Sequence, residues 1–167
     1  MAIKVIYTFL IGIFVAVFIG VGIAAFYPGP KFPEPPAVLK YGNVDIGKDT
    51  AQTAEVKAEI EKYDLEESAY RQLSNIYNRN VSIISITASI LVVIASLTLF
   101  KAILVIADGL LLGGVLTLIY SVIRGFNTED NMFRFVVVSI GLFVSLALGY
   151  IKFIKPSPNT QKSKRRK

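Results

Sequence analysis

One acidic residue, Asp108, lies inside a long apolar run and is the first candidate for chemistry in this sequence. A carboxylate within a membrane-spanning helix marks an ion or proton path by default. Two structural roles compete with that interpretation. Asp108 could cap a helix that begins at Asp108-Gly109, a dipeptide typical of turns, or it could pair with Lys101 near one membrane face. The sequence leaves transport, capping and pairing open, and we expect a structural role.

A row of serines in the preceding apolar run could line a polar path. Ser82, Ser85, Ser89 and Ser96 fall near one face of a helix. Hydroxyl groups so placed also bond the i−4 carbonyl of their own helix. Conduction usually requires more polar groups or a wider, water-lined path. We therefore expect these serines to serve their own helix, with a polar path as the alternative.

The composition excludes much catalytic chemistry. The 167 residues include no Cys and no His, so thiolate or imidazole metal sites, cysteine nucleophiles and His-based triads are ruled out. No phosphate-binding glycine loop, dinucleotide fingerprint or nucleophile elbow occurs. We expect no enzyme activity, no catalytic residue, no cofactor and no metal.

The elements that must position these residues are four apolar runs. The chain is 53% hydrophobic and 18% charged, a balance shifted toward membrane proteins. Uncharged residues fill 5–26, 80–100, 102–123 apart from Asp108, and 135–151. About 20 helical residues cross ~30 Å of hydrocarbon. The sequence predicts an all-α membrane protein with four transmembrane helices.

We divide the chain into four parts from these runs. They are an anchor helix at 1–26, an extracytoplasmic part at 27–80, a three-helix membrane region at 81–155 and a basic tail at 156–167. The first run could instead be a cleaved signal, with Ala24 and Ala25 at its end. A run of 22 residues exceeds the usual apolar region of a signal peptide, so we expect an uncleaved anchor.

Basic residues orient the four helices. Seven of the 18 Lys and Arg residues lie in the last 16 positions. Such a tail determines topology and contacts anionic lipid headgroups, and we expect no nucleic acid as partner. We expect the protein to lie in the cell membrane with both termini on the cytoplasmic side. The chain is then expected to reverse between the second and third helices, within residues 101–109. The lipid-facing basic residues at the end of the tail are Lys162, Lys164, Arg165, Arg166 and Lys167.

The segment between the first two membrane helices has two recognisable parts. Five prolines within residues 27–36 favour an extended, polyproline-like strut. From Thr50 to about Asn78 the residues favour an amphipathic helix, which nothing forces to break before the membrane. Tyr63, Tyr70 and Tyr77 recur every seven residues along it. We expect this stripe to pack on the strut or on headgroups; the alternative is a docking seam for a partner.

Small residues spaced four apart form stripes on three of the predicted helices. Such stripes let helix backbones approach closely, which is how helices gain packing energy in lipid. We expect these residues to close the protein's own bundle, although one stripe could instead face another membrane protein or a second copy of this chain. The predicted packing residues are Gly12, Ala16, Gly20, Gly109, Gly113, Gly141, Ser145 and Gly149.

Several short apolar motifs carry a resemblance to known sequences. They are Tyr7-Thr8-Phe9, Phe26-Tyr27-Pro28-Gly29-Pro30, Asp108-Gly109-Leu110-Leu111-Leu112-Gly113-Gly114 and Gly149-Tyr150-Ile151-Lys152-Phe153. On these motifs the chain resembles small four-helix membrane proteins predicted from the genomes of uncultivated bacteria. The resemblance implies a bacterial cytoplasmic membrane, and it brings no activity and no functional residue.

Two functions remain in view. The first is a structural or accessory component of the cell envelope that acts through protein contacts, with a membrane protein or a second copy as partner. The alternative is a small channel or transporter subunit that uses Asp108 and the serine face. A membrane enzyme is the weakest of the three classes, because no carboxylates and polar residues visibly converge at one interface.

Overall fold

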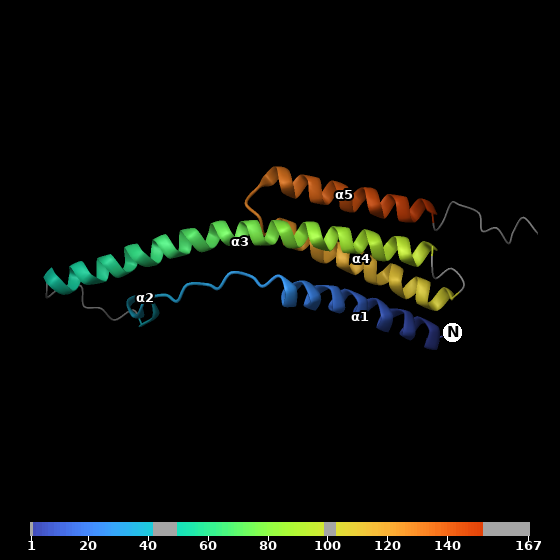
Figure 1. The fold of residues 1–167 in the computed structure, drawn as a ribbon, viewed down its shortest axis with the longest axis horizontal. Coiled ribbons are helices and arrows are strands. Elements are labelled where there is room, and N and C mark those ends of the chain that lie inside the picture. The colour runs from blue at the N-terminus through green and yellow to red at the C-terminus, as the bar shows by residue number, and fades with distance from the viewer. Residues whose placement is uncertain (1, 42–49, 99–102, 152–167) are drawn as a thin grey trace, which may run out of the picture.

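The computed structural model describes residues 2–41, 50–98 and 103–151, which form five α-helices and no strand (Figure 1). By length and composition, four of these helices can cross a membrane. The predicted all-helical architecture with four membrane-spanning helices is confirmed to that extent. The helices are α1 (Ala2–Phe26), α2 (Ala37–Tyr41), α3 (Thr50–Thr98), α4 (Leu104–Phe126) and α5 (Asn131–Gly149).

The longest helix, α3, joins the region outside the apolar runs to the membrane without a break. It has 49 residues and contains neither Gly nor Pro, the residues that most often interrupt helices. The prediction that the helix continues into the apolar run is confirmed. About 30 of its residues precede Asn80, so roughly 45 Å of α3 extends beyond the apolar part at 1.5 Å per residue. Figure 1 shows this extension reaching well past α1, α4 and α5.

Local sequence signals determine where α1 and α4 end and where α5 begins. α1 stops before Pro28, and the Tyr27 amide still donates to the Ile23 carbonyl at 2.7 Å. The Thr128 hydroxyl donates to the Gly125 carbonyl at 2.7 Å, after α4 has ended. Asp130 caps α5, because its carboxylate accepts from the amides of Met132 and Phe133 at 2.9 and 3.1 Å. A short polar turn, residues 127–130, therefore joins α4 to α5.

The reversal between α3 and α4 corrects one prediction. α3 ends at Thr98 and α4 begins at Leu104, so Asp108-Gly109 is not the turn. The N-cap is Ile103, with no side-chain capping bond, and the prediction that Asp108 caps a helix is wrong. The residues from Leu104 onward are apolar, and in lipid they satisfy their backbone amides best by extending the helix. Lys101 lies outside the described residues.

α4 is the central helix of the bundle. It packs closely on α3 and on α1 and less extensively on α5. In Figure 1, α1 and α5 lie on opposite sides of the α3–α4 pair. Most large apolar side chains of α1 and α5 are exposed, as expected for helices that face lipid.

Candidate functional site

The contact between α1 and α4 is built on glycines. A Cβ atom added to Gly113 would lie 2.7 Å from Val15 Cβ and 3.1 Å from the Gly12 carbonyl oxygen. A Cβ atom on Gly109 would lie 2.7 Å from Ile11 Cβ. The two backbones thus approach too closely for any larger residue, and the structure brings together three of the predicted packing residues, Gly12, Gly109 and Gly113.

The remaining predicted packing residues lie elsewhere. A Cβ atom on Gly20 or Gly149 would meet nothing within 4 Å, and one on Gly141 would lie 3.5 Å from Val122. The Ser145 hydroxyl donates to the Gly141 carbonyl of its own helix at 2.8 Å. Ala16 is half-buried in α1. Gly20, Gly141 and Gly149 are therefore not part of the close glycine contact.

The serine face of α3 forms a hydrogen-bond ladder to α4. The hydroxyl groups of Ser82, Ser89 and Ser96 donate to the backbone carbonyls of Ser121, Gly114 and Ala107 at 2.8, 2.7 and 2.6 Å. Donors rise and acceptors fall by seven residues at each step, the register of two antiparallel helices. The expectation that these serines bond their own helix is wrong for the three donors. Gly114 permits the approach, since an added Cβ would lie 2.7 Å from Val93 Cγ2.

The fourth serine, Ser85, behaves differently. It is fully buried, yet its hydroxyl has no hydrogen-bond partner among the described residues. The Ser121 hydroxyl is in the same state, although the Ser121 carbonyl accepts from Ser82. The serine face is thus a packing surface with three used hydroxyl groups, and its buried members line no open path.

Asp108 lies in the second turn of α4 and is half-buried. It directly precedes Gly109, which packs on α1. Within the described residues no group of three or more Asp, Glu, His or Cys residues could hold a metal ion. Asp108 therefore belongs to the bundle and to no acidic cluster in the part of the chain that is described.

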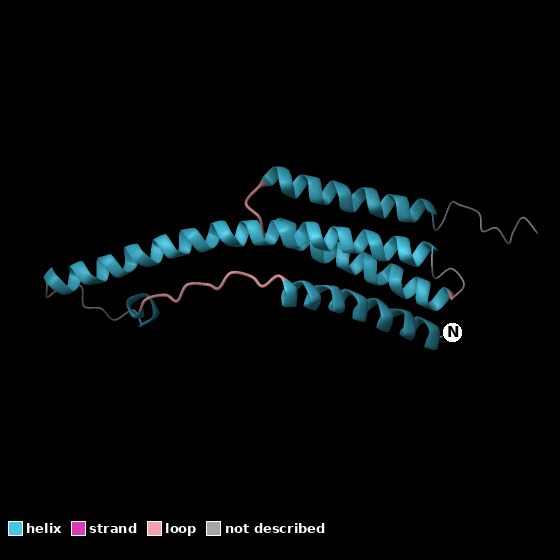
Figure 2. Cartoon of the chain, in the orientation of Figure 1, coloured by secondary structure: helices cyan, strands magenta, loops and turns pink. Residues whose placement is uncertain are grey.

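The tyrosine stripe of α3 contacts the proline segment, which we define as residues 27–36. Tyr77 stacks on Tyr27 with ring centroids 5.4 Å apart, and Tyr70 meets the edge of Phe32 at 5.0 Å. The Asn80 side-chain amide donates to the Tyr27 hydroxyl at 2.9 Å. Figure 2 shows the proline segment as an extended loop that follows α3. Two of the three predicted docking tyrosines therefore contact the proline segment, and all three are half-buried.

An arginine that the sequence analysis did not single out joins α3 to α4 at the same level. Arg124 Nη1 donates to Asn78 Oδ1 at 3.0 Å, and Arg124 Nε donates to the Tyr120 hydroxyl at 3.0 Å. The guanidinium also lies over the rings of Tyr77 and Tyr120, 5.6 and 5.5 Å from their centroids. The i,i+4 spacing of Tyr120 and Arg124 at the end of an apolar run is the signal that could have found it.

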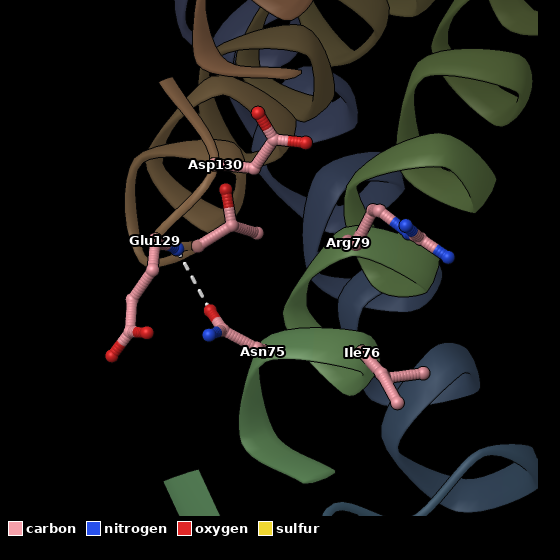
Figure 3. Close-up of a pocket in the computed structure, with 6 residues that line it drawn as sticks. Asn75, Ile76, Arg79, Glu129 and Asp130 are labelled. Carbon is pink, nitrogen blue, oxygen red and sulfur yellow. Dashed lines mark hydrogen bonds between the residues drawn. The ribbon is translucent and has the colours of Figure 1, made fainter. Parts of the chain in front are cut away.

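A shallow pocket lies beside the α4–α5 turn. We call it the turn pocket; its volume is about 320 Å³ and it is lined by Asn75, Ile76, Arg79, Thr128, Glu129 and Asp130 (Figure 3). The Glu129 amide donates to Asn75 Oδ1 at 2.8 Å, which fixes the turn on α3. The turn pocket therefore brings side chains from α3 and from the turn around one opening.

Farther out, α3 has an exposed charged surface. Arg71 Nη2 lies 2.6 Å from Glu67 Oε1, and Lys62 Nζ lies 3.9 Å from Glu66 Oε1. The hydrogen bond to the Glu67 carboxylate, together with its charge, raises the pKa of Arg71 above the ordinary arginine value. Lys62, Glu66 and Arg71 are exposed and Glu67 is half-buried, so both pairs are open to solvent and add little stability. The predicted lipid-facing tail, Lys162 to Lys167, lies outside the described residues.

Comparison with protein-family models, with curated proteins and with solved structures gives no match to this chain.

Proposed function

We propose that this protein is a structural or accessory component of the cell envelope that presents residues 27–80 outside the cytoplasmic membrane and acts through protein contacts. The observation that carries the proposal is the continuity of α3, whose outer part extends far beyond the apolar spans. A helix that only crossed the bilayer would need about 20 residues, not 49. On this proposal the additional length of α3 contacts another protein outside the lipid.

The outer part of α3 also carries exposed apolar side chains among its charges. Leu65 is 67% exposed, Leu73 57% and Ile76 50%. Exposed apolar residues on a soluble helix are ordinary one by one, so we assign the contact surface to the outer part of α3 as a whole. The partner on this proposal is another membrane or envelope protein, or a second copy of this chain.

Photo-crosslinking in native membranes tests the proposal. A photoreactive amino acid at Leu65 should yield a defined protein adduct, which mass spectrometry would identify. The matched control is Phe143, which is 73% exposed on α5 and should crosslink to lipid. An absence of protein adducts from Leu65 and Leu73, with efficient lipid labelling from Phe143, would contradict the proposal.

The proposed orientation has its own test with single cysteines. Cysteines at Ser68 and Glu129, both exposed, should react with an impermeant thiol reagent in intact cells. A cysteine at Ser163 should react only after lysis, because the basic tail is retained in the cytoplasm. Labelling of position 163 in intact cells would reverse the orientation.

Transport remains the alternative, and the serine face lends it no support because Ser82, Ser89 and Ser96 bond the α4 backbone. Ion flux in reconstituted liposomes decides between the two. A flux that disappears in Asp108→Asn while the protein stays folded would favour transport.

A further inference from the structure

The outer part of α3 has a second apolar row besides the tyrosine stripe. Spacings of four, four and three residues place Leu65, Ala69, Leu73 and Ile76 on one side of the helix. All four are exposed, whereas the tyrosines of the stripe are half-buried. No charged residue belongs to this second row, which we call the outer row. Single exposed apolar residues are ordinary, but a contiguous row of them marks an interaction surface.

The outer row continues along the membrane part of α3. Ile83, Leu91 and Ile94 lie on the same side of the helix and are 48%, 62% and 51% exposed. The exposed Arg79 interrupts the row where the apolar run begins. A specific interface takes about 20 to 30 residues from each partner, so the outer row alone is too small. A partner that uses the whole row must follow α3 from the water into the lipid, where only a helix satisfies its own backbone.

Lipid does not reach the far end of the outer row. Leu65 precedes Arg79 by 14 residues, which is about 21 Å of helix at 1.5 Å per residue. The headgroup layer on each side of the hydrocarbon is only ~5–8 Å thick. The far end of the outer row therefore stands in water, and a protein is the occupant that can cover all of it.

The tip of α3 beside the outer row is acidic. Residues 55–71 include six acidic and three basic side chains. Two of the basic ones, Lys62 and Arg71, already pair with glutamates of their own helix. Glu61 and Asp64 lie next to the far end of the row, are exposed, and form no ion pair within the described residues. A partner with basic residues at this level would therefore meet two carboxylates that have no partner ion there.

The same charges argue against a second copy of this chain as the occupant. Two copies cross the membrane in the same direction, so their α3 helices would run parallel, and a two-fold contact would place each residue level with its counterpart. The two Glu61 carboxylates would then lie at one level, and so would the two Arg79 guanidinium groups. Like charges brought together in an interface raise its free energy, which disfavours this pairing.

We propose that the row from Leu65 to Ile94 binds a membrane-spanning helix of another protein, which continues outside the membrane and carries Lys or Arg at the level of Glu61 and Asp64. This inference rests on the proposed function and adds the face of α3 that is used and the chemistry of the partner. The apolar row supplies the contact area, and the charges at its end steer association and fix the orientation of the partner.

Photo-crosslinking of the full chain in native membranes tests the face. A photoreactive amino acid at Leu65, Ala69 or Ile76 should give one common protein adduct. The matched control is Arg71, which is exposed at the same level on another side of α3 and should give little of that adduct. Mass spectrometry should place the crosslinked peptide in a helix that carries Lys or Arg outside a membrane span. An equal yield from Arg71, an adduct with twice the mass of this chain, or an acidic crosslinked peptide would overturn the inference and leave the proposed function standing.

Charge reversal tests the chemistry of the partner. Glu61→Lys combined with Asp64→Lys should lower the adduct yield from Leu65 about tenfold, because two attractive pairs become repulsive. Glu34→Lys, an exposed reversal on the proline segment, should leave the yield within about twofold. Higher salt applied to membranes with the unsubstituted protein should lower the yield as well, because salt screens exposed charges. A yield that charge reversal and salt both leave unchanged, with helical content preserved, would overturn the assignment of a basic partner.

Discussion

α4 meets α1 and α3 through two different kinds of contact, although all three helices are apolar. Toward α1 it presents Gly109 and Gly113, whose missing side chains let the backbones touch. Toward α3 its backbone carbonyls accept from a ladder of serine hydroxyls. In lipid, apolar burial offers no net drive, so close packing and interhelical hydrogen bonds must hold helices together. α4 therefore packs closely through glycines on the face toward α1 and accepts interhelical hydrogen bonds on the face toward α3.

The comparison predicts opposite sensitivities. A contact made by shape should fail when volume is added, because backbone atoms cannot move aside. A contact made by hydrogen bonds should weaken when a donor is removed and should tolerate loss of a hydroxyl that bonds nothing. Each substitution below tests one side of this difference.

The largest effect is expected for added volume between α1 and α4. Gly113→Ile should lower the free energy of unfolding by about 1–3 kcal/mol or more, since its side chain would meet Val15 and the Gly12 carbonyl. Unfolding in mixed detergent measures this. Gly20→Ile is the matched control, because a Cβ atom there meets nothing within 4 Å, and it should change stability by less than ~0.5 kcal/mol. Equal losses of stability in Gly113→Ile and Gly20→Ile would show that the close approach of α1 and α4 does not determine the sensitivity to added volume.

A smaller effect is expected from the ladder. Ser89→Ala removes the donor to the Gly114 carbonyl and should cost about 0.6–1.7 kcal/mol. Ser85→Ala removes an equally buried hydroxyl without a described partner and should be neutral or slightly stabilising. The same unfolding measurement compares them. A larger loss for Ser85→Ala than for Ser89→Ala would mean that burial, and not the hydrogen bond, holds α3 on α4.

The smallest effect is expected outside the membrane spans, where water competes for every contact. Tyr70→Ser removes the edge contact with Phe32, worth about 0.5–1 kcal/mol, and should loosen the proline segment. Trypsin cleavage after the exposed Lys31 should then accelerate about two- to fivefold. Tyr63→Ser, at a position with no ring contact among the described residues, should leave the rate within about twofold. Unchanged cleavage in Tyr70→Ser would show that Phe32 contributes nothing to docking the segment.

The helices themselves could be predicted because each depends on a local property of its own residues. Long apolar runs predict spanning helices, and the lack of Gly and Pro predicts a continuous α3. The partners of the serines could not be predicted. A hydroxyl on a helix reaches either its own i−4 carbonyl or that of a closely packed neighbour. The acceptors here belong to the small residues Ala107, Gly114 and Ser121, and which of them faces each serine depends on how α4 packs on α3.

The structural roles of Asp108 and Arg124 also could not be predicted from local sequence patterns. Asp-Gly favours turns in water, but the surrounding apolar residues favour uninterrupted helix, and the helix prevails over the local signal. Arg124 ends an apolar run and reads as an ordinary boundary cation, yet its partner Asn78 lies 46 residues earlier in the sequence. Contacts of that sequence separation follow from the register of α3 on α4, which no local pattern specifies.

The unbroken course of α3 makes the molecule a lever. With no Gly or Pro to act as a hinge, the helix transmits a tilt of its membrane part to its outer end. Over roughly 45 Å of extension, a tilt of about 10° displaces that end by ~8 Å, more than one helical turn. A small change in how α3 seats on α4, set by three serine bonds, is thus amplified into a large displacement at the surface that we propose contacts other proteins.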